Sequence, residues 1–76
     1  MTVSRLDARD LICPMPVLKA RKALKDLAAG DVLEIQATDP AAHKDFPAFC
    51  EATGHRLLGV DDAGEGVSLF RIEKTA

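Results

Sequence analysis

The sequence predicts an α/β fold: a two-layer sandwich, βαβαββ, with a four-stranded mixed sheet and two helices on one face. Three observations predict it. Two segments place apolar residues at helical spacing, and four short segments have the alternation or composition of strands. The chain has 76 residues, of which 47% are hydrophobic, so it can build one small core. We therefore treat residues 1–76 as a single domain in which one helical layer covers one sheet.

The first half of the chain alternates strand, helix and strand. Apolar or small residues alternate with charged ones over residues 4–8, which predicts a short strand. From Pro16 the apolar residues recur at helical spacing, and we expect this helix to end near Ala28, before Gly30. Residues 33–37 alternate again and predict a strand with one buried face. A right-handed crossover would make the two strands parallel.

The second half is predicted to contain a helix and a hairpin. We expect a turn at Asp39 and Pro40, and then a helix from Asp45 to Thr53 with Pro47 in its first turn, because Pro47 would break a helix that began at Pro40. Gly54 is expected to end this helix. The last two strands and the glycine-containing loop between them are predicted at residues 55–61, 67–74 and 62–66.

Composition narrows the class of protein. The net charge is -2, without the basic excess that drives nonspecific binding to nucleic acid, so we expect no direct nucleic-acid partner. No apolar signal region or membrane-length apolar stretch is evident, so we expect a cytoplasmic protein with no membrane partner. We also expect a monomer. The two cysteines, Cys13 and Cys50, are expected to be free thiols.

The segment from Cys13 to Pro16 is the most informative in the chain. Pro14 suits the first position of a helix, which makes Cys13 the expected N-cap. There its sulfur would face unpaired N–H groups and the positive end of the helix dipole, and we expect a mildly lowered pKa. Pro14, Met15 and Pro16 would shape this site. The alternative is that Cys13 is an inert, buried thiol.

A reactive Cys13 fits sulfur exchange better than other thiol chemistry. A thioredoxin-like site needs a second cysteine where Pro16 stands. Hydrolysis needs a positioned proton-transfer group, and none adjoins Cys13 in sequence. Attack on a persulfide needs only a thiolate, and a good leaving thiolate speeds release of the outer sulfur afterwards. Cys13 is therefore the candidate catalytic residue.

The sequence resembles the TusA-like (SirA-like) family of sulfurtransferases, small sulfur carriers with a Cys-Pro-x-Pro signature. The resemblance extends over nearly the whole chain and rests on Leu6, Asp7, Ala8, Leu11, Ile12, Cys13, Pro14, Met15, Pro16, Val17, Gly30, Asp31, Thr38, Asp39, Pro40, residues 45–50, Gly54 and His55.

The resemblance implies a two-layer βαβαββ fold and a persulfide on Cys13. It implies loading by a cysteine desulfurase or another persulfide donor, and unloading onto a downstream sulfur-carrier protein, with tRNA 2-thiolation as the end point in the best-known branch. Other branches serve sulfur oxidation, molybdenum-cofactor maturation or selenium metabolism. Two positions depart from the pattern: Asp10 stands where the family often has glycine, though Asp also tolerates positive φ, and Met15 stands where members that serve tRNA thiolation frequently have Glu.

Other residues have a structural and a functional interpretation. A basic run beside the site is either a solvated helix face or a docking surface that steers an acidic partner: Lys19, Arg21, Lys22 and Lys25. We expect Cys50 to be a core thiol rather than a second sulfur-bearing one. Asp39 most simply caps a turn or helix. Cys13, Cys50, His43 and His55 lack zinc-type spacing, so we expect no metal and no cofactor.

The leading hypothesis is a persulfide sulfurtransferase. A second is a thiol-dependent regulatory module that docks a partner without transferring sulfur. A third, a small RNA-binding domain, is disfavoured by the acidic net charge and by the scarcity of aromatic residues, which make up 4% of the chain.

Overall fold

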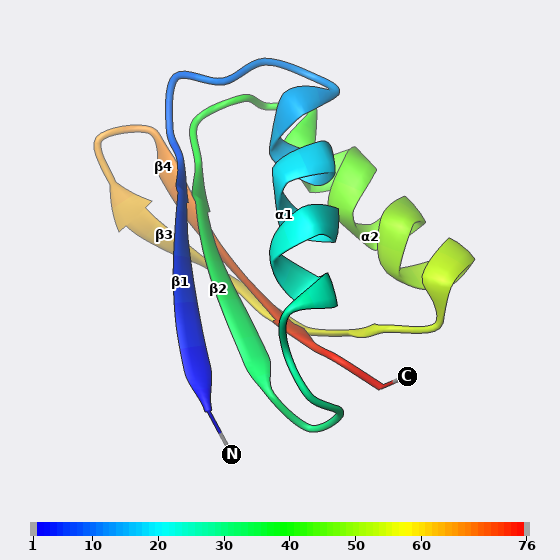
Figure 1. Cartoon of the computed structure of the whole chain (residues 1–76). Helices are drawn as coiled ribbons and strands as arrows, with labels where there is room; N and C mark the ends of the chain where they lie inside the picture. The colour runs from blue at the N-terminus through cyan, green and yellow to red at the C-terminus, as the bar shows by residue number, and fades with distance from the viewer. Residues whose placement is uncertain (1, 76) are drawn as a thin grey trace.

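The computed structural model describes residues 2–75 and contains four strands and two helices. They follow the predicted order βαβαββ. Figure 1 shows α1 and α2 side by side on one face of the sheet, with the other face uncovered. The elements are β1 (Val3–Ala8), α1 (Met15–Lys25), β2 (Val32–Ala37), α2 (Ala42–Thr53), β3 (Arg56–Gly64) and β4 (Val67–Glu73). The predicted fold class is confirmed.

The sheet is mixed, with strand order β1-β2-β4-β3. β1 and β2 are parallel, as the strand–helix–strand pattern predicts, and Val3 pairs with Val32 at one end and Ala8 with Ala37 at the other. β4 lies antiparallel to both β2 and β3. The carboxyl ends of β1 and β2 therefore lie side by side, and the loops that follow them leave the sheet at the same edge (Figure 1).

The core lies between the helices and the covered face of the sheet. The rings of Phe46 in α2 and Phe70 in β4 pack with their centroids 4.8 Å apart. Two small side chains, Ala8 in β1 and Ala20 in α1, are fully buried. The largest fully buried side chains come from α2, β2 and β4: Phe46, Phe70, Leu33, Ile35 and Ile72. Burial of these groups is the main stabilising contribution to a domain of this size.

The first helix ends earlier than predicted, at Lys25 rather than near Ala28. The backbone groups that follow find partners outside the helix. The N–H of Ala28 donates to Oδ2 of Asp31 at 3.0 Å, and the carbonyl of Leu27 accepts from Nζ of Lys74 at 2.6 Å. Because these contacts satisfy the polar groups that a further helical turn would have paired, the chain turns toward β2. Gly30, with φ of 93°, lies in this turn.

The second helix begins earlier than predicted, at Ala42 rather than Asp45, and Pro47 lies inside it. The prediction was wrong because it weighed only the cost of the proline. Pro47 lacks the N–H that would bond to the carbonyl one turn before it, a loss of a single backbone bond. Buried side chains of α2 on either side of Pro47, Phe46 and Cys50, pack into the core and hold the helix together.

The hairpin loop between β3 and β4 is shorter than predicted. β3 extends to Gly64, so Glu65 and Gly66 alone connect the strands. Both have positive φ, 55° and 77°, as a two-residue turn with the twist of a hairpin requires. The position of β4, from Val67 to Glu73, agrees with the prediction to within one residue.

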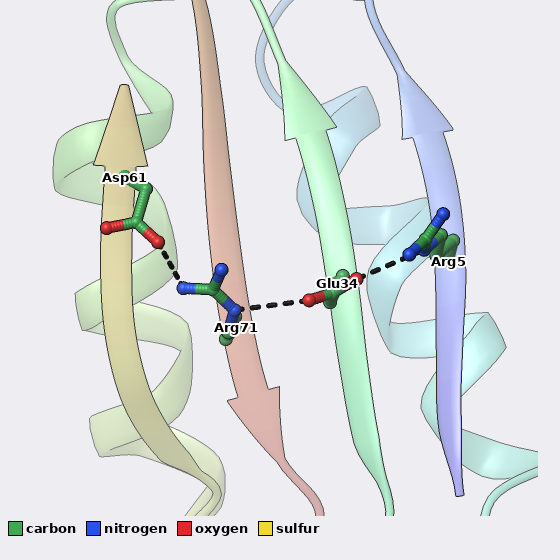
Figure 2. Close-up of polar contacts among 4 residues, drawn as sticks. All are labelled: Arg5, Glu34, Asp61 and Arg71. Atoms are coloured by element: carbon green, nitrogen blue, oxygen red, sulfur yellow. Dashed lines mark hydrogen bonds and ion pairs between the residues drawn. The ribbon is translucent and has the colours of Figure 1, made fainter. Parts of the chain in front are cut away.

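Charged side chains pair with one another across the uncovered face of the sheet. Figure 2 shows Glu34 in β2 between Arg5 in β1 and Arg71 in β4, and Arg71 in turn contacts Asp61 in β3. The Nε atoms of Arg5 and Arg71 lie 3.2 and 3.1 Å from the two Glu34 carboxylate oxygens. This chain of ion pairs spans all four strands, and the formal charges of its four side chains cancel.

Within residues 2–75, neither helix has the length and apolar character needed to cross a membrane.

Candidate functional site

The candidate site lies where two loops meet at the carboxyl ends of the parallel strands. The first loop, residues 9–14, connects β1 to α1 and contains Cys13. The second, residues 38–41, connects β2 to α2. Figure 1 shows both loops at the end of the sheet away from the N-terminus. Because β1 and β2 are parallel neighbours, the fold brings together loops that are far apart in sequence.

The Cys13 loop begins with a residue in the left-handed region. Asp10 has φ of 66°, which confirms that Asp can take the conformation for which the resembling family commonly uses glycine. Its N–H donates to Oγ1 of Thr38 in the neighbouring loop at 2.9 Å. The loop therefore turns sharply after β1 and is fastened to the second loop at that turn.

Cys13 lies just before the first helix rather than at its cap. The N-cap is Pro14, and the Cys13–Pro14 peptide bond is cis, so the prediction that Cys13 caps α1 was wrong by one residue. The N–H of Cys13 donates to Oδ2 of Asp39 at 2.7 Å. Oδ1 of the same carboxylate accepts from the N–H of Ala41 at 3.0 Å. Asp39 thus caps the turn before α2, as predicted, and also holds the backbone of Cys13.

The electrostatic surroundings of Cys13 are opposite in sign to the prediction. The pKa of its thiol is raised above the ordinary value, first by a hydrogen bond to the Asp45 carboxylate, then by partial loss of solvent and by the negative charges of Asp45 and Asp39. Pro14 and Pro16 also remove N–H groups from the start of α1 that could have stabilised a thiolate. Cys13 is therefore an exposed thiol held mainly in its protonated form at neutral pH.

Three large apolar residues close to Cys13 in the sequence are exposed. Ile12, Met15 and Leu18 expose 73%, 42% and 49% of their areas, whereas Pro16 is buried against the core. Pro14, like Met15, is exposed. Of the three residues expected to shape the site, Pro14 and Met15 therefore lie at its surface, and Pro16 anchors the helix start beneath it.

The basic residues of α1 are all exposed but do not form one surface. Arg21, Lys22 and Lys25 line a shallow groove with Leu18 and Asp26, farther along the helix from Cys13. Lys19 instead lies toward β1. Its charge is one of the smaller causes that lower the pKa of Asp7 to about 2, after the hydrogen bonds from Arg9.

The remaining candidate ligands lie apart. Cys50 is buried in α2, as predicted, and burial raises the pKa of its thiol. Nε2 of His43 lies 2.9 Å from Oγ of Ser68, and Nδ1 of His55 accepts from the N–H of Thr75 at 3.3 Å. Among residues 2–75, no three or more His, Cys, Asp and Glu side chains are grouped so that they could hold a metal ion.

Sequence reasoning missed two residues of this site, Asp45 and Thr38. Asp45 was assigned to the start of a helix, and both residues were named in the family resemblance, but neither was given a role at Cys13. Both act across loops, since Thr38 accepts from the N–H of Asp10 and Asp45 raises the pKa of the Cys13 thiol. The parallel pairing of the first two strands is the one signal that could have placed these loops together.

Comparison with known proteins identifies the family. The family model described as Sulfurtransferase TusA matches residues 4–74, which is nearly the whole chain. The chain belongs to the TusA family. The sulfur carrier protein TusA of Pseudomonas entomophila (strain L48) is 46% identical over 71 residues, which are 93% of this chain and 88% of that protein. YrkF of Bacillus subtilis (strain 168) is 52% identical over 60 residues, 79% of this chain, but the chain spans only 32% of the length of YrkF.

A solved structure supports the same assignment at the level of the fold. The SirA-like protein of Desulfitobacterium hafniense superposes with a TM-score of 0.84 and 25% sequence identity, over 99% of this chain and 100% of that one. Membership of the TusA family makes this protein a sulfur carrier, which exchanges sulfur with donors and acceptors. Its exposed thiol and its buried thiol are the two sulfur atoms from which the carrier residue must be chosen.

Proposed function

We propose that Cys13 carries the sulfur, as a persulfide, from a donor such as a cysteine desulfurase to a downstream sulfur-carrier protein. The observation that supports this proposal is the contrast between the two cysteines. Cys13 is exposed on a loop at the edge of the sheet, whereas Cys50 is buried in the core beside Phe46. A protein partner can reach only the first without unfolding α2.

The loading step conserves atoms and electrons. The Cys13 thiol loses its proton and its sulfur attacks the outer sulfur of the donor persulfide, R–S–SH. A bond forms between these two sulfurs as the donor S–S bond breaks, and R–S⁻ leaves and takes up a proton. The products are Cys13–S–SH and R–SH. Unloading repeats the exchange with an acceptor thiolate, and Cys13 is then the leaving thiolate.

The raised pKa of Cys13 means that its thiol must be helped to lose a proton before it can accept sulfur. Because the pKa of the Cys13 thiol is raised, little of it is ionised at neutral pH, and loading in free solution would be slow, since the thiolate is the nucleophile. Loading therefore proceeds in the complex with a donor, where basic groups of the partner can offset the charges of Asp45 and Asp39.

The surface beside Cys13 is proposed to receive the partner. Ile12, Met15 and Leu18 provide apolar contact area next to the sulfur. Arg21, Lys22 and Lys25 lie beyond Leu18, and with Lys19 they would steer an acidic partner toward α1 by electrostatic attraction. Pro14, Met15 and Pro16 would then fix how the sulfur is presented to that partner.

Intact-mass measurement tests the proposal. The protein is incubated with a cysteine desulfurase and free cysteine, then weighed without reductant. Wild type and Cys50→Ala are expected to gain the mass of sulfur, and Cys13→Ser is expected to gain none. Loading of Cys13→Ser, or no loading of wild type, would contradict the assignment. Binding of the desulfurase without any gain of sulfur would instead favour the thiol-dependent regulatory module.

The cellular setting stays a prediction. We propose a cytoplasmic monomer that hands sulfur to tRNA 2-thiolation or to another sulfur-trafficking pathway, with no direct contact to nucleic acid. Capture of partners by wild type and by Cys13→Ala distinguishes a sulfur relay, whose mixed disulfides depend on Cys13, from partners that bind independently of the thiol.

A further inference from the structure

Two backbone ties hold the loop that contains Cys13, and both come from adjacent residues of the second loop. The N–H of Asp10 donates to Oγ1 of Thr38 at 2.9 Å, and the N–H of Cys13 donates to Oδ2 of Asp39 at 2.7 Å. The other oxygen of Asp39 accepts from the N–H of Ala41 at 3.0 Å. One carboxylate thus joins the Cys13 backbone to the turn that begins α2, which is itself anchored in the core by Phe46.

The exposed residues of the loop gain little support from packing. Ile12 is largely exposed, and both Cys13 and Pro14 lie at the surface. The N–H of Met15 donates to the carbonyl of Ile12 at 2.9 Å, a bond local to the loop. The Cys13 backbone is therefore held by the two hydrogen bonds to Thr38 and Asp39, between the packed residues Leu11 and Pro16 on either side of it.

Asp39 is poorly suited to make Cys13 more reactive. A carboxylate near a thiol disfavours the thiolate, and the charge of Asp39 is among the causes that raise the pKa of Cys13, after Asp45. A residue that served reactivity alone would be neutral or basic here. The direct bond to the Cys13 N–H is the contact that an acidic residue at this position makes well, because charge-assisted hydrogen bonds are short and strong.

We propose that Asp39 is a positioning residue for sulfur transfer: its carboxylate fixes the backbone of Cys13 so that the sulfur meets the partner's sulfur in line. The proposal rests on the proposed function of Cys13. It also assigns Thr38 a supporting part, because its hydroxyl holds the start of the same loop. Asp39 touches neither donor nor acceptor and acts only through Cys13.

The chain offers a matched control in Asp31. Its two carboxylate oxygens also accept two backbone N–H groups, from Thr2 at 3.1 Å and from Ala28 at 3.0 Å. This clamp lies at the start of β2, at the opposite end of the sheet from the Cys13 loop (Figure 1). Asp31→Asn and Asp39→Asn therefore make the same change. In each variant the amide keeps one acceptor oxygen and turns its NH₂ donor toward the other backbone N–H, so one of the two hydrogen bonds is lost.

The experiment compares two rates for each protein: single-turnover sulfur transfer from a persulfidated desulfurase, and alkylation of Cys13 by iodoacetamide at neutral pH. Asp39→Asn is expected to slow transfer by about tenfold or more, since misplacement of a reacting group can cost that much, while alkylation stays equal or becomes faster. Asp31→Asn is expected to transfer at the wild-type rate. A variant that is merely less well folded would not separate the two rates in this way.

Thr38→Val is a second, nearly isosteric variant that removes only the Asp10 tie, and it is expected to slow transfer without slowing alkylation. If Asp39→Asn does not fold, Thr38→Val alone tests the proposal. Wild-type transfer by Asp39→Asn, or by Thr38→Val where only that variant folds, overturns the inference, as does equal slowing by Asp31→Asn. Failure of the wild type to accept sulfur is a different result, which overturns the proposed function itself.

Discussion

The two ends of the sheet use the same device for different purposes. At each end one aspartate bridges two backbone N–H groups, Asp31 near the N-terminus and Asp39 beside Cys13. Around Asp31 the chain closes on itself, since the N–H of Gly30 donates to the carbonyl of Lys74 at 2.7 Å and the N–H of Lys74 to that of Asp31 at 2.9 Å. Around Asp39 the same bridge leaves an exposed thiol. A carboxylate clamp can thus serve stability alone or hold a reactive group in place.

The charges around the two clamps also differ in effect. The pKa of Asp31 is lowered, first by the N–H groups of Ala28 and Thr2, and further by the positive charge of Lys74. At the other end the negative groups Asp45 and Asp39 face Cys13 and raise the pKa of its thiol. Asp31 therefore lies near a charge of opposite sign, whereas both charges that act on the Cys13 thiol are negative.

The largest loss of stability should come from a large-to-small substitution in the core that both ends of the sheet share. Phe70→Ala deletes a fully buried ring that packs on Phe46, and such a change typically costs about 3–5 kcal/mol of unfolding free energy. Because one core supports both ends, amide protection is expected to fall together at Cys13 and Ala28, as measured by hydrogen exchange. Loss of protection at one end alone would mean that the ends are stabilised independently.

Much of the fold followed from local patterns in the sequence. The alternation of Leu33, Ile35 and Ala37 predicted β2 and its buried face, and the stripe from Val17 to Leu24 predicted α1. The start of α2 was misplaced because a single proline outweighed the buried residues around it. Packing of Phe46 and Cys50 is a tertiary effect, and local propensity does not contain it.

The place of Cys13 beside the start of α1 agreed with the prediction to within one residue, whereas the direction of its pKa shift did not. Cys13 was found from its own neighbours, since prolines follow it directly in the sequence. The sign of its pKa shift was wrong because Asp39 and Asp45 belong to another loop and helix, and the contact to Asp39 joins residues 26 apart. A helix start seen in isolation indicates a lowered pKa, and only the folded chain adds the opposing carboxylates.

A smaller loss of stability is expected when the carboxylate of Asp31 is removed. Because the pKa of Asp31 is lower in the folded state than in the unfolded chain, its ionised form stabilises the fold above about pH 4, and this contribution is lost as the pH falls through the lowered value. Asp31→Asn should therefore lower the urea midpoint at neutral pH, and the gap from wild type should narrow in acid. A gap that stays constant with pH would show that the ionised carboxylate contributes nothing there.

Asp45→Asn is expected to have the smallest effect on stability. It should also have the clearest effect on the pKa of the Cys13 thiol. Asp45 lies in the first turn of α2, where losing its charge costs at most about 1 kcal/mol. Its hydrogen bond is the main cause of the raised pKa of Cys13, so the variant should move the pH midpoint of Cys13 alkylation downward and speed the reaction at neutral pH.

Two further variants serve as comparisons for the pH midpoint of Cys13 alkylation. Asp39→Asn should shift the midpoint less, because Asp39 raises the pKa of Cys13 only through its charge. Glu51→Gln removes one exposed charge from the same helix, farther from the Cys13 end, and should leave the midpoint unchanged. If Asp45→Asn shifted the midpoint no more than Glu51→Gln does, the Cys13 thiol would not be held by Asp45. The contrast between the two ends would then reduce to exposure alone.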